Sequence, residues 1–374
     1  MKFADIPFHE DVKARLRLMV DTDRLPHALL LQGPSGVGKF MLARAVAQYL
    51  HCTDRSDGEP CGKCPSCRQH AGFNNIDMLF SFPVVKKEGS SQALSSDYMA
   101  EFRDFVSESP FMDPDRWSSS FDKANAKPQF YVEEGAELIR RLSYTNHSAR
   151  YKVVIFWLPE RMNEQTANKL LKLVEEPSDD TKFIFVSNNP SEVLPTIYSR
   201  TQRIDVRRYS DEELAQWLQA EKGLGEEDAT SVAHLAEGNI NRACTLLKAS
   251  RRSRACLDFF IRLMRMAYLR DVAGLRAWSN ELAKEGREAI MTFFEYATRM
   301  LRENFIYALR VDRLNYMNPE EAAFSSRFAP FVNERNVEQL MLAFEDAYRD
   351  IAGNANAKIV CFDLAIKVIL LLRQ

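Results

Sequence analysis

Residues 33–39 read Gly-Pro-Ser-Gly-Val-Gly-Lys and fit the phosphate-loop pattern, in which one glycine is followed after four residues by Gly-Lys. An apolar run at 27–32 comes directly before this loop and predicts a buried strand, and residues 41–50 carry an apolar stripe at helical spacing. Between a strand and a helix, backbone N–H groups of such a loop face phosphate oxygens, and the lysine reaches the terminal phosphates. We therefore expect a phosphate loop at Gly33, Gly36, Gly38 and Lys39.

The rest of the N-terminal half predicts a parallel α/β sheet. Apolar runs at 153–158 and 183–187 indicate two further buried strands, and a helix lies between them with Asn163 as its N-cap and Pro177 at its end. Alternating strands and helices are typical of parallel sheets. Strand patterns stop after about residue 206. We therefore expect an α/β domain at 1–206, a small helical lid at 207–250 and an all-α domain at 251–374.

The residues that should hold Mg²⁺ beside the loop are missing. Phe40 stands where the pattern places a serine or threonine whose hydroxyl ligates the metal. The strand at 153–156 continues into Trp157 and Leu158, where an acidic pair is expected, and Glu160 beyond Pro159 is a poor substitute. Both nucleotide motifs (the Walker motifs) are thus degenerate. We expect no ATP hydrolysis by this chain, whereas weak ATP or ADP binding stays open because Lys39 and the glycines remain.

Four of the seven cysteines are clustered, at Cys52, Cys61, Cys64 and Cys67. Four thiolates at this spacing can surround Zn²⁺ tetrahedrally, which predicts a structural zinc site in an insertion at 52–67. The alternative is four reduced cysteines without a metal. His51 and His70 flank the cluster, and we interpret them as surface or packing residues. A serine-rich stretch at about 86–127 has the character of a surface insertion, with a short helix around 99–106.

Length and composition limit the class of protein. A chain of 374 residues is expected to form two or three domains, and its net charge of −2 excludes nucleic-acid binding through a bulk positive field. No apolar run reaches the length of a membrane span, and the N-terminus lacks the apolar core of a signal peptide. We therefore expect a cytoplasmic protein without a membrane partner.

Arg200 follows the third predicted strand, in the segment 194–201. An arginine at such a connection can reach a neighbouring subunit and stabilise charge on a transferring phosphate. A surface arginine or an internal ion pair explains the residue equally well, so the segment alone leaves the choice open.

Taken together, the motifs resemble one family. They are the segment 24–28 before the loop, the four-cysteine module, the stretch Ala-Asn-Lys-Leu-Leu-Lys-Leu-Val-Glu-Glu-Pro at 167–177, and the segment 194–200. In this order they resemble the bacterial clamp-loader subunits of DNA polymerase III, namely the ATPase gamma/tau and its relative delta-prime. The resemblance covers about residues 5–250, and the C-terminal region resembles the family's collar domain only in general character.

The resemblance implies an AAA+ module with a lid and a collar that joins five subunits in a ring. It implies gamma/tau and delta subunits as partners, together with a sliding clamp and primed DNA reached through the assembled complex. In the family, a Ser-Arg-Cys motif gives an arginine finger to the next subunit's ATP site. This motif stands here as Ser199-Arg200-Thr201, so Arg200 is the residue expected to act in trans.

Departures from the motor pattern favour the delta-prime type. Phe40, Trp157 and Leu158 do not fit an active gamma/tau ATPase, and Asn241 stands where the motor's phosphate-sensing arginine is expected, with Arg242 one residue away. We therefore predict a non-hydrolysing subunit of a DNA polymerase holoenzyme, and whether the chain is itself an enzyme stays open. An active gamma/tau-like ATPase is one alternative.

A second alternative is a zinc-containing DNA-binding protein that uses the basic cluster Arg251, Arg252 and Arg254. A solvated helix surface is the more common meaning of such a cluster. A small-molecule kinase has no support in the later motifs.

Overall fold

The computed structural model describes residues 1–87, 93–121, 127–144, 149–175, 180–310 and 316–373. The chain forms two compact units, Met1–Leu246 and Leu247–Gln374. Among the described helices, none is both long enough and apolar enough to cross a lipid bilayer.

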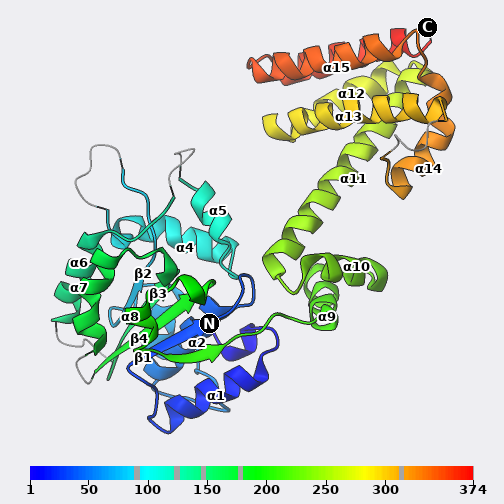
Figure 1. Ribbon diagram of the computed structural model, residues 1–374. Helices are drawn as coiled ribbons and strands as arrows, with labels where there is room; N and C mark the ends of the chain where they lie inside the picture. The colour runs from blue at the N-terminus through cyan, green and yellow to red at the C-terminus, as the bar shows by residue number, and fades with distance from the viewer. Residues whose placement is uncertain (88–92, 122–126, 145–148, 176–179, 311–315, 374) are drawn as a thin grey trace. The chain divides into compact units, whose positions relative to one another are not determined.

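A five-stranded sheet forms the centre of the first unit (Figure 1). Its strands are β1 (Ala28–Gln32), β2 (Met78–Ser81), β3 (Lys152–Trp157), β4 (Thr181–Ser187) and β5 (Gln202–Asp205). Their order is β2-β3-β4-β1-β5, and every neighbouring pair is parallel. The predicted parallel α/β sheet is confirmed, as are its strands β1, β3 and β4. The sequence patterns did not predict β2 and β5.

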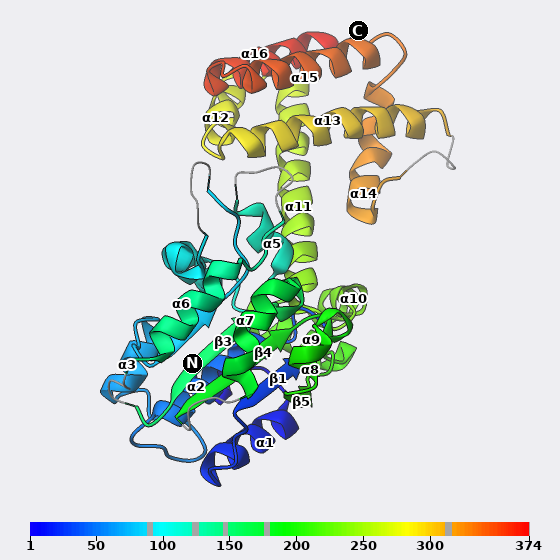
Figure 2. The ribbon, with the colours of Figure 1, turned by 60° about the vertical axis from the view of Figure 1, so that its left-hand side comes forward.

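Helices cover both faces of this sheet. On one face lie α6 (Val132–Leu142) and α7 (Glu164–Glu175) (Figure 2). The apolar layer beneath them includes Leu30, Phe156 and Phe185. On the other face, α2 (Lys39–His51) contacts β1, β3 and β4 and is covered in turn by α1 (Glu10–Asp21). The predicted N-cap of α7 is confirmed, because Asn163 Oδ1 accepts a hydrogen bond from the Thr166 N–H at 2.8 Å. Pro177 lies outside the described residues.

Short helices fill the segments between β1 and β3. They are α3 (Pro65–Ala71), the 3-10 turn η2 (Ser95–Tyr98), α4 (Met99–Glu108) and α5 (Pro114–Ser119). The helix expected around 99–106 is therefore confirmed. The expected surface character of 86–127 is wrong for α4 and α5, because Phe102, Phe105 and Trp117 are buried. These helices form part of the domain core.

The last part of the first unit is helical. After β5 it contains α9 (Asp211–Lys222) and α10 (Glu226–Ala236), which pack along each other, whereas the short α8 (Pro195–Tyr198) lies between β4 and β5. Ser210 and Glu213 form a capping box at the start of α9. The next helix, α11 (Ile240–Leu269), runs without interruption through residue 250, where we expected a domain boundary.

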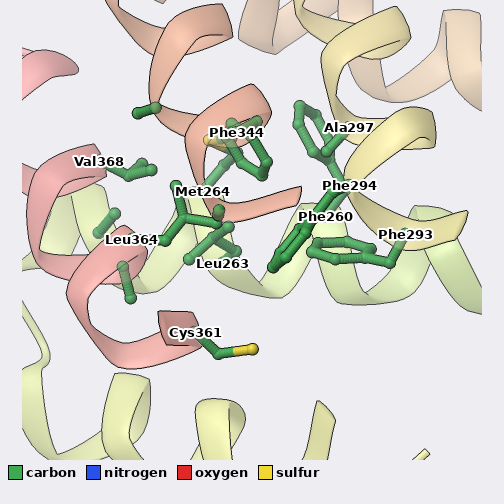
Figure 3. Packing of buried hydrophobic residues seen from close by; sticks show 14 of the residues in the cluster. Phe260, Leu263, Met264, Phe293, Phe294, Ala297, Phe344, Cys361, Leu364 and Val368 are labelled. Carbon is green, nitrogen blue, oxygen red and sulfur yellow. The ribbon is translucent and has the colours of Figure 1, made fainter. Parts of the chain in front are cut away.

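The second unit is helical throughout its described residues, as predicted. After α11 come α12 (Val272–Leu282), α13 (Arg287–Ala308), α14 (Pro319–Phe328), the turn η6 (Ala329–Phe331), α15 (Val337–Ala352) and α16 (Ala357–Leu371). Figure 3 shows part of their common core, to which α11 contributes Phe260, α13 Phe294, α15 Phe344 and α16 Leu364. Cys256 and Cys361 are buried in this core as small apolar residues.

Candidate functional site

The phosphate-loop segment has a backbone that only glycine adopts easily. Gly33, Gly36 and Gly38 have φ angles of +146°, +77° and +83°, and Gly38 is the residue from which α2 begins. At Gly33 a Cβ atom would collide with the backbone carbonyl of Val206 after β5. The loop therefore has the tight turn and the following helix N-terminus that the sequence led us to expect.

Groups of the same chain lie directly on this loop. The Asn239 carboxamide lies so close to Gly36 that a Cβ atom there would collide with it, and the Ile240 N–H donates to the Gly36 carbonyl at 3.3 Å. The Tyr209 hydroxyl donates to the carbonyl of Val37 at 3.1 Å. The residues at the start of α11 and before α9 thus hold the loop from the side of the predicted lid.

Lys39 is turned back into its own loop. Its side chain is buried, and its ammonium donates to the Pro34 carbonyl. Burial lowers the pKa of Lys39 to about 7, although the nearby Glu160 carboxylate acts to raise it. The cation expected to meet phosphate is therefore largely removed from water.

An aromatic cluster contains Phe40 and Trp157, the two positions at which the phosphate-loop pattern led us to look for Mg²⁺ ligands. The Phe102 ring of α4 lies 5.8 Å from Phe40 and 6.1 Å from Trp157, measured between ring centroids. Phe82 stacks on Phe102 at 3.8 Å, and Trp117 of α5 meets Phe102 edge-on at 5.6 Å. We call Phe40, Phe82, Phe102, Trp117 and Trp157 the aromatic plug. Within the plug, Phe40 and Trp157 both contact Phe102, and neither side chain has an oxygen atom that could ligate a metal ion.

Glu160, the possible acidic substitute, is engaged elsewhere. It lies in the turn η3 (Pro159–Arg161), and its Oε1 accepts hydrogen bonds from the N–H groups of Asn188 and Asn189 at 2.9 and 3.2 Å. Burial raises the pKa of this carboxyl. Glu160 therefore ties η3 to the segment after β4.

The four clustered cysteines converge. The sulfur atoms of Cys52, Cys61, Cys64 and Cys67 all lie within 4.8 Å of one another. A tetrahedral site with Zn–S bonds of about 2.3 Å needs sulfurs about 3.8 Å apart, so a small inward movement would complete it. Cys52 follows α2, and Cys64 caps α3, which places Cys67 one turn later. The group can hold a metal ion.

Backbone donors around the cluster favour thiolates. The N–H groups of Lys63 and Cys64 point at Cys61 Sγ at 3.4 and 3.3 Å and lower the pKa of Cys61. Burial alone would raise the pKa of Cys64, but hydrogen bonds from Thr53 and Cys67 lower it to about 6. Burial raises the pKa of Cys52, and that of Cys67 to about 12. A metal ion would relieve the two buried thiols of this penalty.

The cysteine module is attached to the N-terminus of the chain. The Glu59 carboxylate accepts from the N–H groups of Phe3 and Ala4 at 2.8 and 3.0 Å and pairs with Arg17 at 2.7 Å. His51 and His70 are buried beside the module, and their rings join at 3.0 Å between Nδ1 and Nε2. Of the two interpretations offered by the sequence, surface residues or packing residues, the burial of both rings supports packing.

Arg200 is accessible at the surface. Its guanidinium forms an ion pair with Glu175 at the end of α7 and donates to the Thr196 carbonyl at 2.9 Å and to the Ser199 hydroxyl at 3.3 Å. The side chain is 36% exposed, and that of Glu175 is 40% exposed. Thr201, at the position of the family's cysteine, is buried and donates to the Tyr198 carbonyl at 3.0 Å.

Arg200 and the phosphate loop lie at opposite edges of the sheet. Gln202 of β5 pairs with Leu29 near the start of β1, whereas Asp205 pairs with Gln32 just before the loop. Arg200 therefore lies beside the amino ends of these parallel strands and the loop beside their carboxyl ends. At about 3.3 Å per residue the separation is roughly 13–17 Å. An arginine side chain cannot span this distance to its own loop.

The remaining candidates have local partners. Asn241 donates from its side chain to the Phe111 carbonyl at 3.2 Å, and Arg242 pairs with Glu237 at 3.2 Å. Arg251, Arg252 and Arg254 are exposed on α11, and Arg254 pairs with Glu320 at 3.0 Å. Sequence reasoning missed Asn239 and the plug residues Phe82, Phe102 and Trp117.

A family profile described as "DNA polymerase III, delta subunit" matches residues 8–210, more than half of the chain. The chain belongs to this family. This finding confirms the resemblance to the clamp-loader subunits that the sequence motifs indicated.

Curated relatives agree with the assignment. The chain is 32% identical to DNA polymerase III subunit delta' of Pseudomonas aeruginosa over 174 residues, covering 46% of this chain and 41% of that protein. It is 30% identical over 205 residues to subunit gamma/tau of Mycobacterium bovis, covering 55% and 28%. With subunit tau of Escherichia coli, it is 25% identical over 251 residues, covering 65% and 32%. The chain thus spans well under half the length of these relatives.

Proposed function

We propose that this chain is a clamp-loader subunit of the delta-prime type, which does not hydrolyse ATP itself. In this role it assembles with gamma/tau and delta subunits and helps to load a sliding clamp onto primed DNA. Its AAA+ domain presents Arg200 to the ATP site of a neighbouring subunit, and its C-terminal helical domain serves as the collar.

The aromatic plug carries this proposal. Phosphoryl transfer needs a metal ion to neutralise charge on the phosphates. Where the motor subunits require a hydroxyl and a carboxylate, Phe40 and Trp157 are joined by Phe102 in a dry cluster. Polar ligands cannot be regained there by a small shift, because the rings pack against one another and against Trp117.

Arg200 supports the second half of the proposal. The side chain is exposed, and it lies on the opposite edge of the sheet from its own phosphate loop. An arginine in that position can serve a phosphate only on another molecule. Its present partner is one exposed carboxylate, that of Glu175, and exposed ion pairs of this kind are weak enough to exchange.

The four cysteines are proposed to hold one structural Zn²⁺. Four converging sulfurs leave no open position for a catalytic water, and zinc would brace a module with little apolar core. We expect one zinc per chain by elemental analysis, and loss of zinc in Cys61→Ser. The chelated protein should become sensitive to protease within 52–67 while the sheet persists. Full-length protein that contains no zinc when purified in zinc-supplied medium would contradict the assignment.

ATP turnover tests the main proposal. The purified chain alone should show no turnover above background. When it is added to gamma/tau and delta with clamp and primed DNA, turnover by the complex should rise. Steady turnover by the chain alone would support the alternative of an active ATPase. Tight DNA binding by the chain alone, with a steep decrease at higher salt, would support the DNA-binding alternative.

A further inference from the structure

The second unit contains a groove that the proposed function does not use. It has a volume of about 640 Å³ and lies between α11, α14, the turn η6 and the last residues of the chain. This volume is within the range of about 300–1,000 Å³ that is common for ligand sites. Its lining residues are Ile261, Met264, Arg265, Tyr268, Glu320, Ala323, Phe324, Arg327, Phe328, Phe331 and Leu372.

The floor of the groove is apolar and firmly packed. Met264, Phe328 and Leu372 are almost fully buried and belong to the core of the unit. Phe324 stacks on Phe328 with ring centroids 5.0 Å apart. Such a floor is fixed in shape before a ligand arrives, so little conformational freedom is lost on binding.

Large side chains on the wall remain open to water. Tyr268 is 45% exposed and Phe331 is 37% exposed, and their rings meet edge-on at 5.0 Å. Aromatic residues, methionine and arginine are the types enriched at protein interfaces, and tyrosine and arginine often supply most of the binding energy. The composition of the groove is therefore that of a docking surface.

The positive charge at the rim of the groove favours a negatively charged ligand. Arg265 and Arg327 line the groove and are exposed, and neither guanidinium forms an ion pair with any residue that the structure describes. The one acidic residue of the lining, Glu320, is paired with Arg254 at 3.0 Å, and Arg373 lies over the Tyr268 ring. An apolar floor below two unpaired arginines complements a segment that has apolar side chains and flanking carboxylates.

We propose that this groove binds a short acidic peptide segment of a partner protein, with apolar side chains in the groove and carboxylates on Arg265 and Arg327. Each carboxylate can accept two parallel hydrogen bonds from a guanidinium, which fixes the register of the peptide. The proposal does not depend on whether the chain hydrolyses ATP or on the role of Arg200.

A labelled peptide tests the proposal on the full-length chain. The probe is a fluorescein-labelled peptide in which aspartates alternate with leucine and phenylalanine, and binding is followed by fluorescence anisotropy. The doubly substituted Arg265→Glu/Arg327→Glu chain should bind at least about tenfold more weakly, since attraction is replaced by repulsion. Binding by the wild type should also weaken between about 0.1 M and 1 M salt, where the Debye length falls from ~10 Å to ~3 Å.

Two further variants test whether peptide binding depends on the groove itself or only on the net charge of the chain. Arg276→Glu/Arg335→Glu makes the same change in net charge at exposed positions outside the groove and should bind like the wild type. Ala323→Trp fills the groove from an exposed helix position and should reduce binding while thermal unfolding stays unchanged.

Three results would overturn the proposal. The first is equal binding by all variants, and the second is no binding of the probe to the wild type. The third is that the groove variants fail to join gamma/tau and delta in size-exclusion chromatography. In that case the groove is covered by a neighbouring subunit and is not free for a peptide.

Discussion

The carboxyl and amino edges of the central sheet carry side chains of opposite character. At the carboxyl edge, the loop after β1 keeps its backbone shape, but Phe40, Trp157 and Phe102 fill the space beside it. At the amino edge, Arg200 keeps its charge and its exposure. Under the proposed function, the carboxyl edge needs no metal ion and can accept apolar side chains, whereas the amino edge serves a neighbouring subunit and must stay polar and accessible. Structural and catalytic constraints are therefore separable within one domain.

Removal of Arg200 should have the largest effect. An arginine finger contributes roughly 10³–10⁵ in rate at the site that it serves. Arg200→Ala should abolish the part of ATP turnover that the chain adds to the gamma/tau and delta complex, although other sites of the ring continue. The control is Arg203→Ala, which removes a nearby exposed arginine that lies over the Tyr198 ring. If both variants stimulate turnover like the wild type, Arg200 has a structural role only.

A substitution in the aromatic plug at the carboxyl edge should instead lower the free energy of unfolding. Phe102 is fully buried at the centre of the aromatic plug, so Phe102→Ala leaves a cavity and should cost about 3–5 kcal/mol in the free energy of unfolding. Phe73→Ala is a milder comparison, because the Phe73 ring touches Phe80 from a half-buried position. Urea denaturation measures both. Equal losses would mean that the plug has no special place in the core.

Sequence patterns predicted the parts of the site that are contiguous in the chain. The glycine loop, the four cysteines and the loss of polar groups at Phe40 and Trp157 could be found from spacing alone. The plug could not, because Phe82, Phe102 and Trp117 come from separate segments, and the serines and prolines of 86–127 indicated a surface insertion around Phe102 and Trp117. Helical spacing within 99–106 marks an apolar face that contains Phe102, but it does not show that this face packs against Phe82 and Trp117.

Two strands were missed for a related reason. β2 (Met78–Ser81) has four residues, and β5 (Gln202–Asp205) has one buried residue, Ile204, among exposed ones. Runs this short are set by pairing with β3 and β1, which lie far away in the sequence. The longer fully buried strands β1 and β3 needed no such partner information.

The pH dependence of stability tests how dry the carboxyl edge is. Lys39 titrates near 10.5 in an unfolded chain, and burial lowers its pKa to about 7 in the fold. Folding disfavours the charged form of Lys39. Above pH 10.5 the lysine is neutral in both states and does not reduce the free energy of unfolding, but this free energy decreases as the pH falls from 10.5 towards about 7. Lys39→Met cannot take up this proton.

The Lys39→Met variant should therefore exceed the wild type in the free energy of unfolding by on the order of 4–5 kcal/mol near pH 7, which is the free-energy equivalent of a pKa that falls from 10.5 to about 7. The difference should shrink towards pH 10.5, where the wild-type lysine is neutral in both states. Urea midpoints at both pH values give the answer, with the exposed Lys358→Met as the control. A difference that does not change with pH would place the Lys39 ammonium in water.

The smallest change is expected from Glu175. Glu175→Gln removes the carboxylate that pairs with Arg200, and both side chains are more than a third exposed. Such a pair contributes at most about 1 kcal/mol, so stability should barely change and turnover by the complex should stay within about fivefold of the wild type. A loss as large as that of Arg200→Ala would show that Glu175 positions the arginine for its neighbour.

The order of strands in the sheet also affects how the chain is made. Ala28 of β1 pairs with Phe183 of β4, which is 155 positions later (183 − 28), and its other neighbour, β5, is synthesised later still. At ~5–20 residues per second, the ribosome needs about 8–30 s to produce β4 after β1. During this time Leu29, Leu30 and Leu31 have no strand beside them. Newly made chains therefore carry this apolar strand without its sheet partners until translation has passed residue 187.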